Sequence, residues 1–233
     1  MGGGAPGLST SGPWGSTGMA PRAPPFWTQS SPFTCGPAAL ANVLLGLGWR
    51  PAAPSRSLEE ARIWRESAIL ACPGSHPWGL AVASGRRGHR SRVGIEGDRP
   101  FLFDHIRSDH PGVTRRLYAS VEEELRRHAG ALGARPARDP VAEGVAPGSV
   151  GLLLVEARKL GHRSGGPHWV GWVDRPGGWT LLDPLARGPR PTGRDAAWWW
   201  RHSGYAGTRA WIGLESGRPE GDRRTDDPAT RPA

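Results

Sequence analysis

The feature that most constrains this chain is an apolar segment, residues 36–47, that begins directly after Cys35. Its side chains are apolar nearly all the way round, which predicts a helix that is buried rather than half exposed. Gly36 and Pro37 permit a tight turn into this helix, because proline is tolerated in a first helical turn. The sulfur of Cys35 is therefore expected at the N-terminus of a buried helix, where the helix dipole favours a negative charge.

Three further helices are predicted from capping and apolar periodicity. Residues 57–60, Ser-Leu-Glu-Glu, form a capping box, and the helix that it begins is expected to run to about residue 71. Pro77 fits the first turn of the next helix, which is expected to end near residue 88. Residues 121–132 are amphipathic and are followed by a glycine, which is typical of a helix end.

Several short runs are predicted as strands, namely residues 92–95, 114–118, 150–155, 168–173, 178–182 and 209–214. Most of them follow the helices along the chain. Helices first and an antiparallel sheet afterwards predict a protein of the α+β class.

The composition bounds the rest of the chain. Residues 1–22 and 216–233 are rich in Gly, Pro and charged or small polar residues, which predicts disordered tails around one domain at 23–215. Two cysteines are too few for a disulfide framework and lack zinc spacing. No membrane segment and no secretory signal are recognisable, so a cytoplasmic, reduced protein is the expectation.

The net charge of +9 raises the question of nucleic-acid binding. All but one of the 30 Lys and Arg residues are arginine, and they are spread over a chain that is rich in Ala, Gly and Pro. This distribution indicates a coding bias rather than a basic patch, and no aromatic ladder accompanies the arginine pairs. A nucleic-acid partner is therefore not expected. Residues 198–200, three consecutive tryptophans, are expected to line a groove or fill an aromatic core.

Four residues supply the parts of a thiol hydrolase in one order along the chain. Cys35 would be the nucleophile, and Gln29, six residues upstream, could donate an amide N–H to an oxyanion. His168 and Asp183 follow far downstream as an imidazole and a carboxylate that could orient it. A thiol is largely un-ionised at neutral pH, so a catalytic cysteine needs a neighbouring imidazolium or a helix dipole to form its thiolate.

Strand geometry brings two of these residues together. Residues 168–173 and 178–183 have the form of a hairpin with a four-residue loop, in which Val173 would pair with Gly178. Counting outward from that pair places His168 opposite Asp183, with their Cβ atoms about 5 Å apart on one face. A register slip of one residue would place them on opposite faces.

Each of these residues also has an ordinary structural interpretation. Cys35 alone fits a buried helix cysteine, Gln29 a loop residue, and Asp183 with the proline after it a turn at a strand end. Cys72 and His76 could form a second pair, but they lie in a Pro/Gly loop without a nearby carboxylate, so Cys72 is expected to be a packing residue. The remaining histidines, at positions 76, 89, 105, 110, 128, 162 and 202, lack metal-ligand spacing, and neither a metal nor a cofactor is expected.

The segment from Gln29 to Leu40, with its order Gln-x5-Cys-Gly-Pro-Ala-Ala-Leu, resembles the start of the C39-like peptidases, a branch of the papain-like cysteine proteases. Residues 63–67 and 79–83, the His-Trp-Val run at 168–170 and the Asp-Pro pair at 183–184 are similar to a stand-alone bacterial subgroup. The resemblance covers roughly residues 27–213. It implies a papain-like architecture in which N-terminal helices pack on a C-terminal antiparallel sheet.

The same resemblance implies roles for the four residues. Cys35 would be the nucleophile, His168 the general base and acid, Asp183 the orienting residue, and Gln29 part of the oxyanion hole. The separation between Cys35 and His168 is longer than in the leader-processing C39 domains, so their cleavage of double-glycine leaders is not carried over.

The expected function is hydrolysis of an amide or peptide bond in a peptide or protein substrate. An acyl or peptidyl transferase would use the same residues, with an amine in place of water. A non-catalytic peptide-binding module that retains the fold is the third alternative. The sequence indicates neither the substrate nor the oligomeric state.

Overall fold

A computed structural model describes residues 26–52, 55–69, 72–97, 100–106, 108–138, 149–175 and 178–215. The predicted tails, 1–22 and 216–233, lie outside these ranges. The described residues form five α-helices: α1 (Cys35–Gly46), α2 (Arg56–Ser67), α3 (Pro77–Gly85), α4 (Pro111–Ala131) and α5 (Ala196–Ser203). They also form nine strands: β1 (Ala68–Ile69), β2 (Cys72–Ser75), β3 (Arg90–Glu96), β4 (Arg135–Ala137), β5 (Val150–Glu156), β6 (Pro167–Arg175), β7 (Gly178–Leu182), β8 (Arg190–Thr192) and β9 (Arg209–Glu215).

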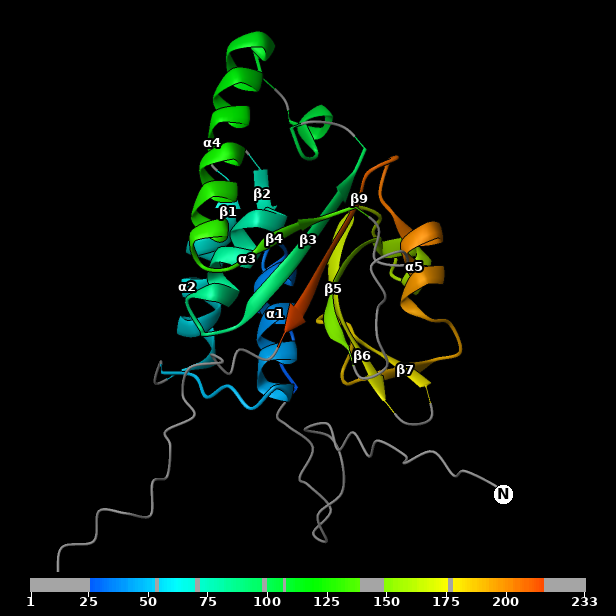
Figure 1. The fold of residues 1–233 in the computed structure, drawn as a ribbon. Helices are drawn as coiled ribbons and strands as arrows, with labels where there is room; N and C mark the ends of the chain where they lie inside the picture. Colours follow the sequence, from blue (N-terminus) through cyan, green and yellow to red (C-terminus); the bar gives the residue numbers. More distant parts are fainter. Residues whose placement is uncertain are drawn as a thin grey trace, which may run out of the picture.

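Helix α1 lies at the centre of the molecule, as its apolar sequence predicts. It packs against β5 and β6 on one side and against α2 and α3 on the other (Figure 1). Residues 35–44 of this helix are all buried. Gly171 in β6 permits the close packing, because a Cβ there would lie 2.8 Å from the side chain of Val43.

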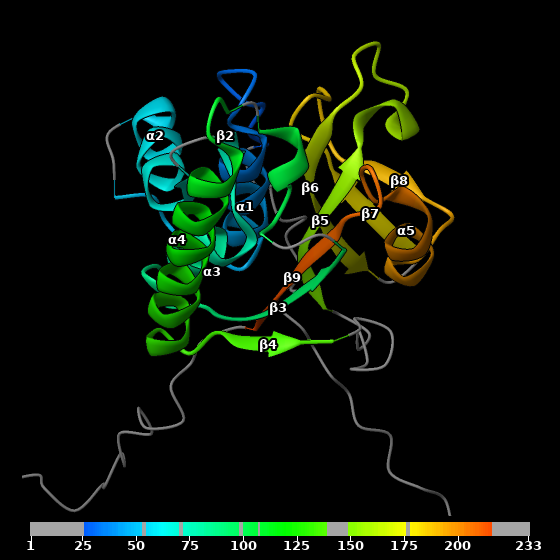
Figure 2. The ribbon, with the colours of Figure 1, turned by 90° about the horizontal axis from the view of Figure 1, so that it is seen from above.

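The sheet has seven strands in the order β4-β3-β9-β5-β6-β7-β8. All neighbouring pairs are antiparallel except β3 and β4, which run parallel, so the protein is α+β with a mixed sheet. The expectation of a purely antiparallel sheet was wrong at this edge. The reason is α4, which lies between β3 and β4 in the chain and carries it back across the molecule, so that β4 enters in the same direction as β3 (Figure 2).

The two faces of the sheet carry separate apolar cores. Leu152, Leu154 and Ile212 belong to the core that contains α1 and α3, whereas Leu153 and Trp211 belong to a second core on the other face. Helix α5 covers this second core, opposite the other four helices (Figure 2). The tryptophans at 199 and 200 pack there, which confirms the core interpretation of the Trp-rich segment.

One predicted strand proved to be helical. Residues 114–118 lie inside α4, which begins at Pro111 and is 21 residues long, instead of the shorter 121–132 expected from its amphipathic part. Tyr118, Glu122 and Ala129 are its buried residues, a spacing that belongs to one face of a helix. This burial across several turns outweighs the β preference of a short run that contains a β-branched and an aromatic residue.

Helix α2 also differs from its predicted bounds at both ends. It begins two residues earlier than the capping box implies, because the side chain of Ser55 accepts a hydrogen bond from the Leu58 N–H at 3.3 Å. It ends at Ser67 instead of near residue 71, since the chain continues as β1. Helix α3 likewise ends at Gly85, before the predicted residue 88.

We expect replacement of Ser55 by alanine to lower the free energy of unfolding by about 1 kcal/mol, because it removes an N-terminal cap. Ser57→Ala is the matched control, since Ser57 lies inside the helix and is expected to change the stability by only about 0.5 kcal/mol or less. Urea denaturation of the two variants measures the difference. Equal losses of stability, or a larger loss in Ser57→Ala, would instead identify Ser57 as the N-cap, as the capping box predicts.

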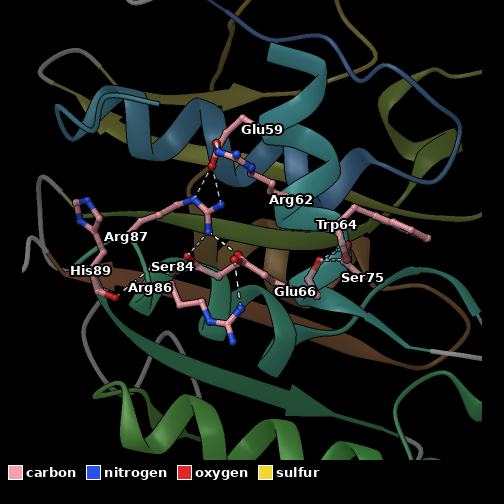
Figure 3. A network of polar contacts seen from close by, with 11 residues as sticks. Glu59, Arg62, Trp64, Glu66, Ser75, Ser84, Arg86, Arg87 and His89 are labelled. Atoms are coloured by element: carbon pink, nitrogen blue, oxygen red, sulfur yellow. Dashed lines mark hydrogen bonds and ion pairs between the residues drawn. The ribbon is translucent and has the colours of Figure 1, made fainter. Parts of the chain in front are cut away.

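A polar network joins the end of α3 to α2. Arg87 lies between Glu59 and Glu66, with its NH2 2.7 Å from Glu59 Oε1 and its NH1 2.6 Å from Glu66 Oε2 (Figure 3). Glu59 and Glu66 lie about two helical turns apart on the same face of α2, so a single guanidinium reaches both carboxylates. Arg62 and Arg86 approach the outer side of the same carboxylates.

Candidate active site

Cys35 is the first residue of α1 and is buried, with 7 % of its surface exposed. The first helical hydrogen bond runs from the Ala38 N–H to the Thr34 carbonyl, so the Cys35 N–H belongs to the helix start, where amide groups have no partner within the helix. Gly36 allows the start of α1 to lie against β2, because a Cβ at this position would be 2.8 Å from the Ser75 side chain. The predicted position of the sulfur at the N-terminus of a buried helix is confirmed.

His168 and Asp183 lie side by side, as the hairpin predicts. Nε2 of His168 is 2.8 Å from Oδ1 of Asp183, and both residues are buried. Because an ionised carboxylate can only accept, the imidazole donates this hydrogen bond from Nε2. The Cys35 side chain lies close enough to His168 to raise the pKa of this imidazole.

The register of the hairpin differs from the predicted one by two residues. Val173 pairs with Thr180, and Arg175 pairs with Gly178, because the strands continue further toward the turn than a four-residue loop allows. Asp183 therefore lies just beyond the end of β7 instead of directly opposite His168. A shift of two residues keeps both side chains on the same face, which explains why the contact forms in spite of the wrong register.

The charges of this pair stabilise one another. Burial lowers the pKa of His168, but hydrogen bonding and electrostatic interaction with Asp183 and Cys35 outweigh burial and raise that pKa to about 9. Burial raises the pKa of Asp183, whereas hydrogen bonds from His168, from the Leu185 N–H and from His162 bring it down to about 2. At neutral pH the imidazole is therefore a cation between a carboxylate and a thiol.

Gln29 lies near this group through its backbone, but its side chain is engaged elsewhere. Its N–H donates to the Pro184 carbonyl at 3.0 Å, which ties the loop before α1 to the turn after β7. The side-chain Nε2 donates to the carbonyl of Ser31 at 2.8 Å, and Oε1 is buried without a hydrogen-bond partner in the described part of the chain. In this arrangement the predicted oxyanion donor is held by its own loop. Glu60 holds the same loop by accepting the Ser30 N–H at 2.8 Å.

A second histidine contacts the same carboxylate, and sequence reasoning missed it. Nε2 of His162 is 2.8 Å from Oδ2 of Asp183, and its ring meets the His168 ring edge-on at 5.5 Å. His162 lies on the loop between β5 and β6, and its sequence position is that of one of several scattered histidines. The sequence feature that could have indicated His162 is its position in the loop that leads directly into the strand of His168.

His162, His168 and Asp183 offer three ligand atoms within 4.8 Å of one another, a grouping that could hold a metal ion. The sequence spacing of the histidines did not indicate this grouping, which forms only in the fold. Each atom of the trio already has a hydrogen-bond partner within it, so the geometry is accounted for without an ion.

A cavity opens beside Cys35, and its wall is mostly apolar. The apolar part includes Phe33, Ile69, Phe101, Leu154 and Trp169. The tryptophans at 198–200 are not among its lining residues in the described part of the chain, so they do not shape this cavity.

His76 is one of the residues that line the cavity, and it has a carboxylate partner. Its Nδ1 accepts the Trp78 N–H at 3.1 Å and caps α3, and its Nε2 is 3.2 Å from Glu122 Oε2. The expectation that no carboxylate lies nearby was wrong, because Glu122 comes from α4, far along the chain. The side chain of Cys72 lies outside the described part, so its packing role stays a prediction.

These features define an α+β protein in which a cysteine at a buried helix N-terminus lies near a histidine of β6 and an aspartate that directly follows β7. Residues 24–183 match the family model described as the Peptidase_C39 like family, so the chain belongs to that family. The match extends from the loop before α1 to Asp183, which confirms the resemblance inferred from the motifs. No curated protein matches the chain. Within the described residues, none of the helices combines the length and the apolar character needed to cross a membrane.

Proposed function

We propose that this protein is a thiol hydrolase of the cysteine-peptidase type with a papain-like architecture. In this proposal Cys35 is the nucleophile, His168 the general acid and base, and Asp183 the residue that orients the imidazole. The observation that carries the proposal is the chain of contacts from the Cys35 thiol through the His168 ring to the Asp183 carboxylate, with the imidazole cationic at neutral pH.

The reaction follows from the position of each group. The Cys35 thiolate attacks the carbonyl carbon of the amide, and His168 gives its proton to the leaving amine as the C–N bond breaks. A thioester to Cys35 remains. His168, now neutral, takes a proton from water, the resulting hydroxide attacks the thioester, and the acid leaves while the thiolate–imidazolium pair is restored.

The oxyanion of each tetrahedral intermediate needs hydrogen-bond donors. The backbone N–H of Cys35, at the start of α1, is one candidate, and the helix dipole favours negative charge at that point. The amide of Gln29 is the second candidate, and it would have to exchange its bond to the Ser31 carbonyl for one to the substrate.

The cavity beside Cys35 supports a peptide substrate with an apolar side chain next to the scissile bond. Phe33, Ile69 and Trp169 provide its apolar contacts, and the ring nitrogens of His76 are taken up by Trp78 and Glu122. A charged side chain would lose its hydration there without gaining a partner.

The proposal is tested with a library of peptides that vary at the residues around one amide bond, incubated with wild type and with Cys35→Ser. We expect the wild type to cleave peptides with an apolar residue near the scissile bond, and Cys35→Ser to cleave none. Mass spectrometry of the acid-quenched wild type should detect a peptidyl thioester on Cys35. Absence of any cleavage or thioester, together with equal peptide binding by wild type and Cys35→Ser, would favour the binding module.

The same incubation with an added amine distinguishes hydrolysis from transfer. A hydrolase yields the free acid even when the amine is abundant, because water reaches the thioester. Predominant formation of the amine adduct at low amine concentration would identify a transferase on the same residues.

A further inference from the structure

The Asp183 carboxylate is fully buried, and both of its oxygens are used. Oδ1 accepts hydrogen bonds from His168 Nε2 at 2.8 Å and from the Leu185 N–H at 3.0 Å. Oδ2 accepts one from His162 Nε2 at 2.8 Å. A buried carboxylate oxygen without a hydrogen-bond donor destabilises the fold. The hydrogen bond from His162 therefore satisfies the second oxygen of Asp183.

We propose that His162 is a positioning residue, which donates from Nε2 to Asp183 Oδ2 and so holds the carboxylate in the orientation that His168 requires. The inference rests on the proposed function of His168 and Asp183. His162 is placed to act through Asp183, because its contact is with the far oxygen of the carboxylate. Its role is therefore separate from those of the residues that touch the substrate.

The location of His162 supports this role. Its side chain is 16 % exposed, whereas those of Asp183 and His168 are 0 % and 4 % exposed, so His162 forms the outer cover of the pair. The 3-10 helix at Ala157–Leu160 ends at Gly161, whose positive φ of 85° turns the chain toward the pair. The His162 N–H donates to the Ala157 carbonyl, which fixes the backbone of this turn.

The titratable groups in contact with this carboxylate among the described residues are His162 and His168, and Cys35 contacts His168. Loss of the His162 donor therefore has a definite direction. Burial disfavours the ionised form of Asp183, and the hydrogen bond from His162 is one of those that offset this effect. Without that bond the pKa of Asp183 should rise. Asp183 would become protonated at a higher pH, and the decline of the Cys35 alkylation rate at low pH (the acid limb of the pH profile) should shift to higher pH with it.

Two substitutions separate the hydrogen bond from packing. His162→Phe keeps a ring against His168 but removes the donor, whereas His162→Gln keeps an N–H donor at a similar reach. His128→Phe and His128→Gln are the matched controls, because His128 is exposed on α4. The rate of Cys35 alkylation by a neutral reagent is measured from pH 3 to 9 in all variants, together with the thermal midpoint.

In His162→Phe we expect the pKa of Asp183 to rise by about one unit from its value of about 2, so that the rate of Cys35 alkylation at pH 3 falls by about twofold, the effect of losing one charge-assisted hydrogen bond. His162→Gln should restore most of the wild-type profile. The His128 variants should leave it unchanged. A His162→Phe profile that coincides with the wild type overturns the proposal, as does an equal shift in His162→Gln.

Two further measurements keep the outcomes distinct. NMR titration of Asp183 in Cys35→Ser, with and without His162→Phe, measures the carboxylate without any need for catalysis. If Cys35 reacts like an ordinary thiol but the Asp183 pKa still rises on removal of His162, the proposed function fails and the positioning contact stands. A wild-type profile that changes to that of His162→Phe on addition of a chelator would instead assign the trio to a bridging metal ion and overturn the hydrogen-bond role.

Discussion

Replacement of His168 by alanine is expected to slow alkylation of Cys35 at pH 6 by about 100-fold. An ordinary cysteine has a pKa of about 8.5, so well under 1 % of it is thiolate at pH 6. In this protein a cationic imidazole contacts the thiol, and a neighbouring cation favours the thiolate. Removal of the imidazole removes that charge and should return Cys35 toward ordinary behaviour, apart from the helix dipole.

The pH dependence gives this prediction a second readout. His168 stays protonated until the pH approaches about 9, and Asp183 stays ionised until the pH approaches about 2. As pH rises through 9 the imidazolium is lost, and as pH falls toward 2 the carboxylate is lost. Between these limits both charges of the His168–Asp183 pair persist, so the wild-type alkylation rate should depend less steeply on pH than that of His168→Ala, which should rise about tenfold per pH unit below the ordinary thiol pKa.

Mass spectrometry after alkylation reports each cysteine separately, so Cys72 serves as a reference within the same molecule. His128→Ala is the control for loss of an exposed histidine. If Cys35 in the wild type reacts no faster than Cys72 at pH 6, or if His168→Ala leaves its rate unchanged, the thiolate–imidazolium pair does not exist and the hydrolase proposal fails.

Replacement of Arg87 by methionine is expected to lower the free energy of unfolding by about 3 to 5 kcal/mol. The Arg87 side chain is 9 % exposed, and its two partners, Glu59 and Glu66, are 5 % and 16 % exposed. Methionine keeps the apolar stem of arginine but leaves two largely buried carboxylates without their shared cation. Because α2 and α3 together cover α1, the loss should destabilise the whole domain.

The matched control is Arg92→Met, which breaks the exposed pair of Arg92 with Glu215, where both side chains are nearly half exposed. Such pairs contribute about 0 to 1 kcal/mol, so this variant should unfold close to the wild type. Urea denaturation measures both variants. Adding Glu59→Gln and Glu66→Gln to Arg87→Met should recover part of the loss, because the two carboxylates that have lost Arg87 are then replaced by neutral side chains. A loss below about 1 kcal/mol in Arg87→Met would show that water reaches the network.

Local patterns were sufficient to predict much of this protein from its sequence. The apolar residues after Cys35 predicted a buried helix with the cysteine at its start, and α1 is that helix. The two strand-like runs before and after the Asp-Arg-Pro-Gly loop predicted the hairpin that brings His168 to Asp183. Even a register wrong by two residues preserved this contact, because side-chain direction in a strand repeats every two residues. These features depend on neighbours within a few turns or one hairpin.

Only the tertiary structure decided which distant residues join them. His162 donates a hydrogen bond to the second oxygen of Asp183. Glu122 pairs with His76, and Arg87 binds two carboxylates of α2. A single polar residue has no periodicity, so no local pattern marks its partner, which depends on how whole elements pack. The same holds for the engagement of Gln29 by its own loop. The sequence by itself thus determined the buried helix, the α+β class and the Cys35, His168 and Asp183 candidates, whereas packing between distant elements decided how the charges around them are paired.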